Sequence, residues 1–384
     1  MDFDFSDDQE MLRDTVRRWV DKDYGFEHRR GIVKSGGHSA ATWQQLAELG
    51  LLGLQVPEAH GGMGFGAVDA MVVMEELGRG IVLEPVAAVS LVAAGLLRRA
   101  SDEALQSRWL PAIASGEALV VLAHQERAAR YRLDHVETRA VQSGDTWQLS
   151  GRKSLVPVGD KADAYIVPAR VSGEVGDASG IALFLVERTA DGVTTRGYGT
   201  QDGARAAELT LANAPAALVS AAGSGDDSAY ASLELAADTA MAALCAEGVG
   251  VMDRLLALTV EYMNTRKQFG VVISSFQALK HRVADVKMQV ELARSMSYYA
   301  TLKLDETPAA RRRAIAQAKY QLNQSARFVG QQCVQLHGGI GVTDEYVGSH
   351  YFKRLTMIEL AFGDSNYQIG EVAARMQDTA GVFA

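Results

Sequence analysis

Six residues in the last third of the chain are suited to holding a molecule that carries phosphates and flat rings. They are Arg266, Phe269, Gln277, Gln335, Gly338 and Gly339. An arginine supplies a planar, permanently charged fork, and paired glycines let backbone amides approach a phosphate closely. Phe269 can cover a ring face, while the glutamine amides can hydrogen-bond polar ring edges. Singly, each has a plainer interpretation: Arg266 can pair with Glu261, Phe269 can lie in a core, and the glycines can end a helix.

A different chemistry, proton abstraction, is possible at position 247. The residues around Glu247 are mostly alanine, glycine, leucine, cysteine and valine. Apolar surroundings desolvate a carboxylate, which raises its pKa and makes it a stronger base. We therefore expect Glu247 to be a catalytic base. The alternative is a structural glutamate paired with an arginine from elsewhere, because buried carboxylates are usually paired.

Long helices must position these residues. Small or apolar side chains recur at three- and four-residue steps at 276, 279, 283, 286, 290 and 293, and again at 315, 318, 322, 325 and 329. Such stripes are typical of helices that pack in a bundle.

The chain divides into three zones that differ in pattern. Residues 1–116 have helical spacing, residues 117–225 consist of short apolar runs separated by turn signals, and residues 226–384 return to helix. Short punctuated strands favour an antiparallel barrel or sandwich. We predict an α+β protein with an N-terminal helical domain, a central antiparallel β-barrel domain and a C-terminal helical bundle. The absence of alternating strands and helices disfavours a nicotinamide cofactor.

Composition excludes several classes of protein. The net charge of −9 argues against nucleic-acid binding, which needs a basic surface. Cys245 and Cys333 have no ligands at metal spacing, so no metal site is expected. The acidic N-terminus does not resemble a signal peptide, and Glu84 and Pro85 interrupt the most apolar stretch. We expect a cytoplasmic protein without a membrane span.

Two long motifs resemble the acyl-CoA dehydrogenase family. One is YMNTRKQFG at 262–270, and the other is QLHGGIG at 335–341, followed by YFKR at 351–354. A weaker likeness covers the whole chain and is strongest to the small-subunit branch of the pimeloyl-CoA dehydrogenases. The family fold has an N-terminal helical domain, a central β-barrel and a C-terminal four-helix bundle, usually in a tetramer.

The resemblance implies the cofactor, the partners and the reaction. A base removes a proton from the α-carbon of an acyl-CoA, FAD accepts the β-hydride at N5, and a trans-2-enoyl-CoA is released. An electron-transferring flavoprotein then reoxidises the flavin. The six residues named first are implied to contact FAD, part of them across a subunit interface. The expected assembly is a homotetramer or an α2β2 heterotetramer.

The sequence departs from the family where its base usually stands. Phe362 occupies the usual glutamate position, and Ala240 occupies the second family position, twenty-two residues before Tyr262. Glu247 follows Ala240 by seven residues, close to two helical turns, so both project from one face. Asp364 is the second candidate for the base.

The central domain also departs from the family pattern. Gln125-Glu126-Arg127 replaces the usual Thr-Glu-Pro, and Leu155-Val156-Pro157 replaces the Trp-x-Thr that packs against the flavin. Pro157 offers neither a side-chain hydroxyl nor a backbone N–H.

Three functions stay open at this point. The chain can be a catalytic dehydrogenase subunit that uses Glu247, with a bulky or dicarboxylic acyl-CoA as substrate. It can be a non-catalytic or half-site subunit of an α2β2 complex. It can also be a flavin monooxygenase or oxidase on the same fold, since those enzymes lack the glutamate. Arg127, Arg130 and Arg132 can meet a distal carboxylate of the substrate or be surface charges.

Overall fold

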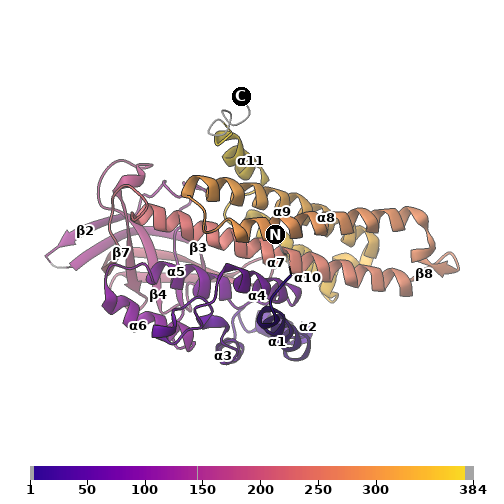
Figure 1. The fold of residues 1–384 in the computed structure, drawn as a ribbon. Helices are drawn as coiled ribbons and strands as arrows, with labels where there is room; N and C mark the ends of the chain where they lie inside the picture. The colour runs from indigo at the N-terminus through magenta and orange to yellow at the C-terminus, as the bar shows by residue number, and fades with distance from the viewer. Residues whose placement is uncertain (1–3, 145, 377–384) are drawn as a thin grey trace. The chain divides into compact units, whose positions relative to one another are not determined.

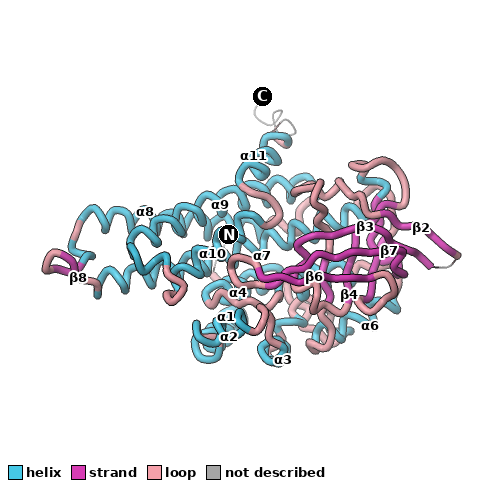
Figure 2. Tube along the Cα trace, turned by 180° about the vertical axis from the view of Figure 1, so that it is seen from behind, coloured by secondary structure: helices cyan, strands magenta, loops and turns pink. Residues whose placement is uncertain are grey.

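The computed structural model describes residues 4–144 and 146–376, and contacts divide the chain into two compact units. The helical unit comprises residues 1–30, 67–82 and 241–384, and the β unit comprises residues 31–66 and 83–240. Helices, then strands, then helices follow one another along the chain, as predicted. Figure 2 distinguishes the helices from the strands by colour. The domain boundaries at 116 and 225 stay predictions.

The helical unit is built mainly from long helices. They are α1 (Asp7–Asp23), α4 (Ala67–Arg79), α8 (Gln277–Leu302), α9 (Pro308–His337), α10 (Val347–Leu360) and α11 (Ser365–Ala374), with 3-10 turns at Ile273–Ser275 and Gly338–Val342. Helices α2 (Phe26–Lys34) and α7 (Ala229–Thr265) each extend across the boundary between the units. Strands β8 (Lys267–Gln268) and β9 (Val271–Val272) form a hairpin between α7 and α8. Figure 1 shows α8 and α9 running side by side.

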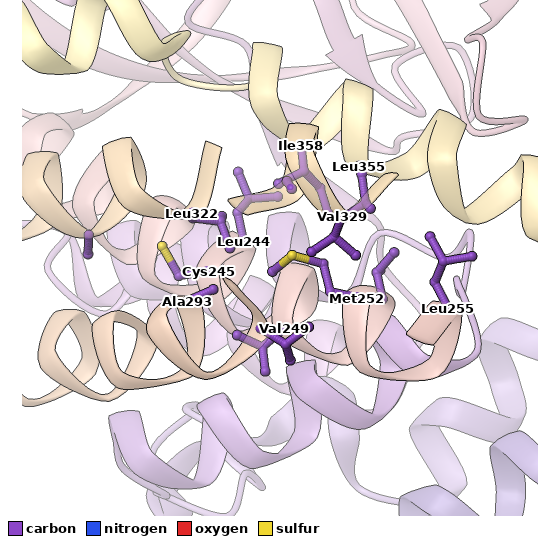
Figure 3. Packing of buried hydrophobic residues seen from close by; sticks show 14 of the residues in the cluster. Leu244, Cys245, Val249, Met252, Leu255, Ala293, Leu322, Val329, Leu355 and Ile358 are labelled. Carbon is purple, nitrogen blue, oxygen red and sulfur yellow. The ribbon is translucent and has the colours of Figure 1, made fainter. Parts of the chain in front are cut away.

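The bundle core follows the predicted stripes. Val290 and Ala293 of α8 and Leu322 and Val329 of α9 are fully buried. Side chains from α7 and α10 complete this core, as Figure 3 shows. Phe276, which begins the first predicted stripe, is 37% exposed because it precedes the first residue of α8 rather than lying within the helix.

The β unit contains a seven-stranded sheet and short helices. The strands are β1 (Val120–Leu122), β2 (Arg139–Ser143), β3 (Thr146–Pro157), β4 (Ala164–Arg170), β5 (Ile181–Glu187), β6 (Val193–Gly199) and β7 (Arg205–Ser220). The helices are α3 (Ala40–Glu48), α5 (Ala94–Leu97), α6 (Glu103–Ala114) and a π-helical segment at Ala87–Ala93, with 3-10 turns at Leu51–Gly53, Glu58–His60 and Ala178–Gly180.

The sheet closes on itself as a small barrel. Strands β4, β2, β3, β7 and β5 follow one another, and β5 pairs again with β4, while β1 and β6 pair at the margins. The barrel is not wholly antiparallel, contrary to the prediction, because β1 and β2 both run parallel to β4. Strand β4 is buried along its whole length, which a strand in the middle of the sheet requires.

No helix among residues 4–144 and 146–376 is long and apolar enough to cross a membrane.

Candidate functional site at the end of the helical bundle

The structure brings the six predicted cofactor residues to one end of the helical unit. Met263 near the end of α7, Ile273 before α8 and Leu336 near the end of α9 form a small buried cluster there. This cluster ties together the three chain segments that carry the six residues. The β8–β9 hairpin extends from the same end (Figure 1).

The hairpin presents an aromatic ring to solvent. Phe269 and Gly270 connect the two strands and both have positive φ, +53° and +80°, as a two-residue type I′ turn requires. A phenylalanine seldom adopts this conformation, and its side chain is 91% exposed. The core interpretation of Phe269 is therefore wrong. An exposed ring held in a strained turn is suited to covering a ligand or a partner surface.

Three predicted polar contacts of the cofactor come from the same end of the unit. The side chains of Arg266, Gln277 and Gln335 are all exposed. The Arg266 guanidinium forms no hydrogen bond or ion pair with any described residue, so the pairing with Glu261 considered above is not found. Two hydrogen bonds fix the backbone of Arg266: its N–H donates to the Tyr262 carbonyl at 2.8 Å, and its carbonyl accepts from the Ile273 N–H at 2.9 Å.

The paired glycines end a helix and are exposed to solvent. Helix α9 ends at His337, and Gly338 has φ +65° and ψ −141°, which glycine alone adopts readily. Gly338 and Gly339 are exposed, and a Cβ atom on either would meet no other atom within 4 Å. The Gly338 amide is already engaged, because it donates to the carbonyl oxygens of Val334 and Gln335 at the end of α9. The turn as a whole can still be approached closely from solvent.

A buried histidine supports this turn, and sequence reasoning did not identify it. His337 Nδ1 lies 2.8 Å from the Cys333 carbonyl oxygen and Nε2 lies 2.9 Å from Tyr346 Oη. Its ring packs on Tyr262 with 4.8 Å between centroids. Burial lowers the pKa of His337, although the hydrogen bond with Cys333 opposes this. The neutral ring thus links α9, α7 and the segment before α10. In the sequence, the position of His337 directly before Gly338 was the feature that could have indicated this role.

This surface fits one side of FAD. An uncommitted guanidinium and an exposed aromatic ring are groups that bind a pyrophosphate and an adenine, and an exposed glycine turn leaves room for the cofactor beside them. Arg266, Phe269, Gln277, Gln335, Gly338 and Gly339 would hold the cofactor. All six are exposed to solvent in the single chain.

Glu247 lies at a crossing of helices within the helical unit. Glu247 is only 4% exposed. Arg354 of α10 donates hydrogen bonds to both of its carboxylate oxygens. Arg354 Nε donates to Oε1 at 2.5 Å and Nη2 donates to Oε2 at 2.8 Å. This is the bidentate geometry that makes strong ion pairs. The structure thus contains the arginine partner that the alternative interpretation of Glu247 required.

Close packing of α4 against α7 surrounds the same residue. A Cβ atom on Gly78 of α4 would overlap the carbonyl oxygen of Glu247, and one on Gly250 of α7 would overlap that of Glu75. The two helix backbones therefore approach closely at Glu247 and, three residues further on, at Gly250. This packing supports a structural role for the Glu247–Arg354 pair.

The segment that carries Phe362 is held by buried polar groups. Lys319 Nζ donates to Asn323 Oδ1 at 2.6 Å and to the Ile358 carbonyl at 2.8 Å. Asn323 Nδ2 donates to the Gly363 carbonyl at 3.2 Å, and Gln368 Nε2 donates to that of Phe362 at 2.8 Å. Phe362 has φ +54° and packs against the bundle core. The segment is thus fixed, but its side chain cannot accept a proton.

Asp364, the second candidate base, begins a helix. Its Oδ1 accepts a hydrogen bond from the Tyr367 amide at 2.9 Å, which caps α11. This is the usual work of an N-cap aspartate.

The two altered motifs of the β unit lie in different environments. Glu126 is buried and accepts hydrogen bonds from Lys153 Nζ and Thr138 Oγ1, both at 2.7 Å. Burial alone would raise the pKa of Glu126, but Lys153 and the hydrogen bonds outweigh it and lower that pKa. Leu155 is 46% exposed with φ +53°, and Pro157 pairs with Ala206 of β7. This second motif offers neither an aromatic ring nor a hydroxyl to a flavin.

Family models match all three parts of the chain. They describe the N-terminal, middle and C-terminal domains of acyl-CoA dehydrogenases and match residues 6–117, 122–214 and 236–377. The chain therefore belongs to the acyl-CoA dehydrogenase family, whose members are FAD-dependent oxidoreductases.

Individual relatives agree over almost the full length. The chain is 30% identical over 378 residues to the probable acyl-CoA dehydrogenase YngJ of Bacillus subtilis, covering 96% of this chain and 97% of the relative. A variant of the Tcur3481-Tcur3483 steroid ACAD superposes with a TM-score of 0.87 at 28% identity, covering 97% and 99%. The ChsE4-ChsE5 complex from Mycobacterium tuberculosis also gives 0.87, at 27% identity over 99% and 100%.

Proposed function

We propose that this chain takes part in FAD-dependent α,β-dehydrogenation of an acyl-CoA as the subunit that does not supply the base. The observation that carries this proposal is the bidentate Glu247–Arg354 pair, in a chain with Phe362 at the usual base position. A base must turn a free carboxylate oxygen towards the proton that it removes. Both oxygens of Glu247 already accept from Arg354, and freeing one would leave a buried charge unpaired.

The chain's own contribution is then to bind cofactor. Arg266 would hold the pyrophosphate, Phe269 would cover the adenine, and the exposed Gly338–Gly339 turn would let the cofactor approach the backbone closely. When bound, FAD accepts the hydride that leaves the β-carbon of the substrate. The exposure of all these groups supports a cofactor site shared between subunits, with the base on a partner of the same fold.

An α2β2 assembly is the arrangement that suits such a chain. The solved ChsE4-ChsE5 complex pairs two different chains, and this chain superposes on it over 99% of its length. An electron-transferring flavoprotein would reoxidise the flavin. For the substrate we propose a bulky or dicarboxylic acyl-CoA; a similar structure is described as a steroid ACAD. Arg132 is less suited to a distal carboxylate than Arg127, because Arg132 already pairs with Asp134 at 2.9 Å.

The test compares the chain alone with the chain co-expressed with a second acyl-CoA dehydrogenase subunit from its own source. We expect the chain alone to hold little flavin and to show no bleaching of added FAD by a panel of acyl-CoAs, including pimeloyl-CoA and a steroid-side-chain CoA. The co-purified complex should be yellow and bleach. A flavin-loaded homotetramer that bleaches without a partner would overturn the proposal.

A second candidate keeps Glu247 as the base. It is favoured by the burial of the carboxylate among alanine and glycine residues of α7, which restricts water around it. The Glu247→Gln variant separates the two functions. If Glu247 is the base, a complex that carries this variant binds FAD and acyl-CoA but no longer bleaches. Rapid oxygen consumption by the reduced complex would instead favour the monooxygenase or oxidase alternative.

A further inference from the structure

The loop that carries Gly338 and Gly339 is closed at its base by a side-chain hydrogen bond. This loop, residues 338–345, begins where α9 ends and leads to Tyr346, the residue before α10. His337 Nε2 lies 2.9 Å from Tyr346 Oη, so the two residues that flank the loop are joined directly. Most of the loop is exposed to solvent, and its conformation therefore depends on contacts at its ends and beneath it.

The loop also rests on the end of α9. A Cβ atom on Gly341 would lie 2.9 Å from His337 Cβ and 2.8 Å from the Val334 carbonyl oxygen, so the backbone approaches too closely for any side chain. Within the loop, the Thr343 amide donates to the Ile340 carbonyl at 3.1 Å. That hydrogen bond requires the loop to keep its turn, so exchange of this amide reports how often the loop opens.

The neighbours of His337 fix which ring nitrogen carries the proton. A backbone carbonyl only accepts, so Nδ1–H must donate to the Cys333 carbonyl at 2.8 Å. In the neutral ring Nε2 then has no hydrogen and accepts from the Tyr346 hydroxyl. The ring packs on Tyr262 of α7. Helices α9 and α7 thus orient the imidazole towards the hydroxyl that closes the loop.

The far part of the loop is anchored to α10 instead. His350 Nε2 donates to the Asp344 carbonyl at 3.0 Å, and Lys353 Nζ donates to Asp344 Oδ1 at 2.7 Å. The His350 ring packs edge-on against Phe26 of α2, with 5.0 Å between centroids. Since the far part is held in this way, the bond at the base sets how the near part of the loop meets the end of α9.

We propose that His337 is a positioning residue of the cofactor site, which acts through the Tyr346 hydroxyl to hold the loop in the form that FAD requires at Gly338 and Gly339. The inference rests on the proposed function, since it takes FAD to bind at this turn. His337 is only 3% exposed, whereas the two glycines are open to solvent. The imidazole therefore supports the site from beneath and needs no contact with the cofactor.

The variant Tyr346→Phe tests this role with little disturbance, because it removes one hydroxyl and keeps the ring. In the full chain without flavin, amide exchange followed by mass spectrometry should quicken about fivefold across residues 338–345, as the loss of one neutral hydrogen bond predicts. In the assembled protein, FAD should bind about two- to fivefold more weakly, because the binding-competent fraction of the loop falls.

Tyr351→Phe is the matched control. It also removes a buried tyrosine hydroxyl of the helical unit, which donates to the Arg79 carbonyl at 2.6 Å, but it lies outside the loop. Loop exchange and FAD affinity should therefore stay unchanged. Equal effects of Tyr346→Phe and Tyr351→Phe on both measurements would overturn the proposal.

Two variants of His337 separate hydrogen bonding from packing. His337→Phe keeps an aromatic ring on Tyr262 but loses both hydrogen bonds, whereas His337→Gln loses the ring and keeps an amide oxygen that can accept from Tyr346. A positioning role predicts tighter FAD binding by the Gln variant than by the Phe variant, and a packing role predicts the reverse. Adding Tyr346→Phe to His337→Phe should change little, because the hydroxyl has already lost its acceptor; additive effects would contradict the proposal.

The outcomes also separate this inference from the proposed function. If Arg266→Gln weakens FAD binding and Tyr346→Phe does not, the cofactor site stands and the positioning role of His337 is wrong. If neither variant weakens FAD binding, the cofactor site and the inference fail together. Weaker binding in both variants, with faster loop exchange only in Tyr346→Phe, is the expected result.

Discussion

Arg354 of α10 holds both carboxylate oxygens of Glu247 of α7, at 2.5 and 2.8 Å, across 107 positions of sequence. A carboxylate in this arrangement joins two helices of the bundle. The backbone of the same residue also touches α4 at Gly78. Glu247 thus lies where α7, α10 and α4 meet, and its contacts join these three helices.

Replacing Glu247 by Gln should destabilise the chain, because the largely buried Arg354 loses its charge partner. We expect a loss of about 3 kcal/mol in the free energy of unfolding, measured by urea titration. Glu187→Gln is the control, since it removes the more exposed Arg108–Glu187 pair and should cost less than about 1 kcal/mol. A Glu247→Gln chain with unaltered stability would argue against the structural role.

Replacing Gly250 by Ala should also destabilise the helical unit. The new methyl group would overlap the Glu75 carbonyl and push α4 away from α7. Overpacking of this kind costs about 1–3 kcal/mol, more than the gain of about 1 kcal/mol from helix propensity. Thermal unfolding measures it. The control is Gly95→Ala, at a helical glycine with open space around it, which should leave the stability unchanged or raise it. If Gly95→Ala lowers the stability as much as Gly250→Ala does, the clash is not the cause.

Replacing Arg266 by Gln should weaken FAD binding about tenfold in the assembled protein, since a charge-assisted hydrogen bond contributes about 1.5–3 kcal/mol. Stability should not change, because the Arg266 side chain is exposed. Flavin fluorescence during titration measures the affinity. Arg327→Gln, an exposed arginine within α9, should leave FAD binding unaltered. Equal affinities for both variants would remove Arg266 from the cofactor site.

Lys319 should make stability depend on pH in alkaline solution. Burial lowers the pKa of Lys319 to about 8, from 10.5. Between these values the native state has lost the proton while the unfolded state keeps it, so raising the pH stabilises the native state. Below pH 8 both states are protonated and this gain is absent.

The comparison with Lys319→Met isolates that effect. The free energy of unfolding of the unaltered chain, less that of the variant, should rise by about 3 kcal/mol from pH 8 to 10.5, because one pKa unit corresponds to about 1.4 kcal/mol. Cys245, whose pKa burial raises to about 12, is present in both proteins and largely cancels. Urea titrations at four pH values provide the test, and parallel curves for the two proteins would contradict it.

Much of the architecture followed from local pattern. The apolar stripes of α8 and α9 predicted a bundle, and both helices bury most of those stripes, although the first stripe is more exposed at its start. Periodicity is local, since residues three and four apart share a face whatever packs against it. The parallel pairing of β1 and β2 with β4 was missed for the complementary reason, because strand direction depends on how distant segments return to one sheet.

By itself, the sequence determined the family, the helical bundle and the absence of a carboxylate at Phe362. Only the tertiary structure decided what Glu247 does, since its apolar neighbours on α7 are compatible with a base and with a buried ion pair. The partner comes from α10, and only the helix crossing brings Arg354 within reach. Likewise, only the path of the chain around Gly341 brings Tyr346 back to His337, which the spacing of these residues along the chain does not encode.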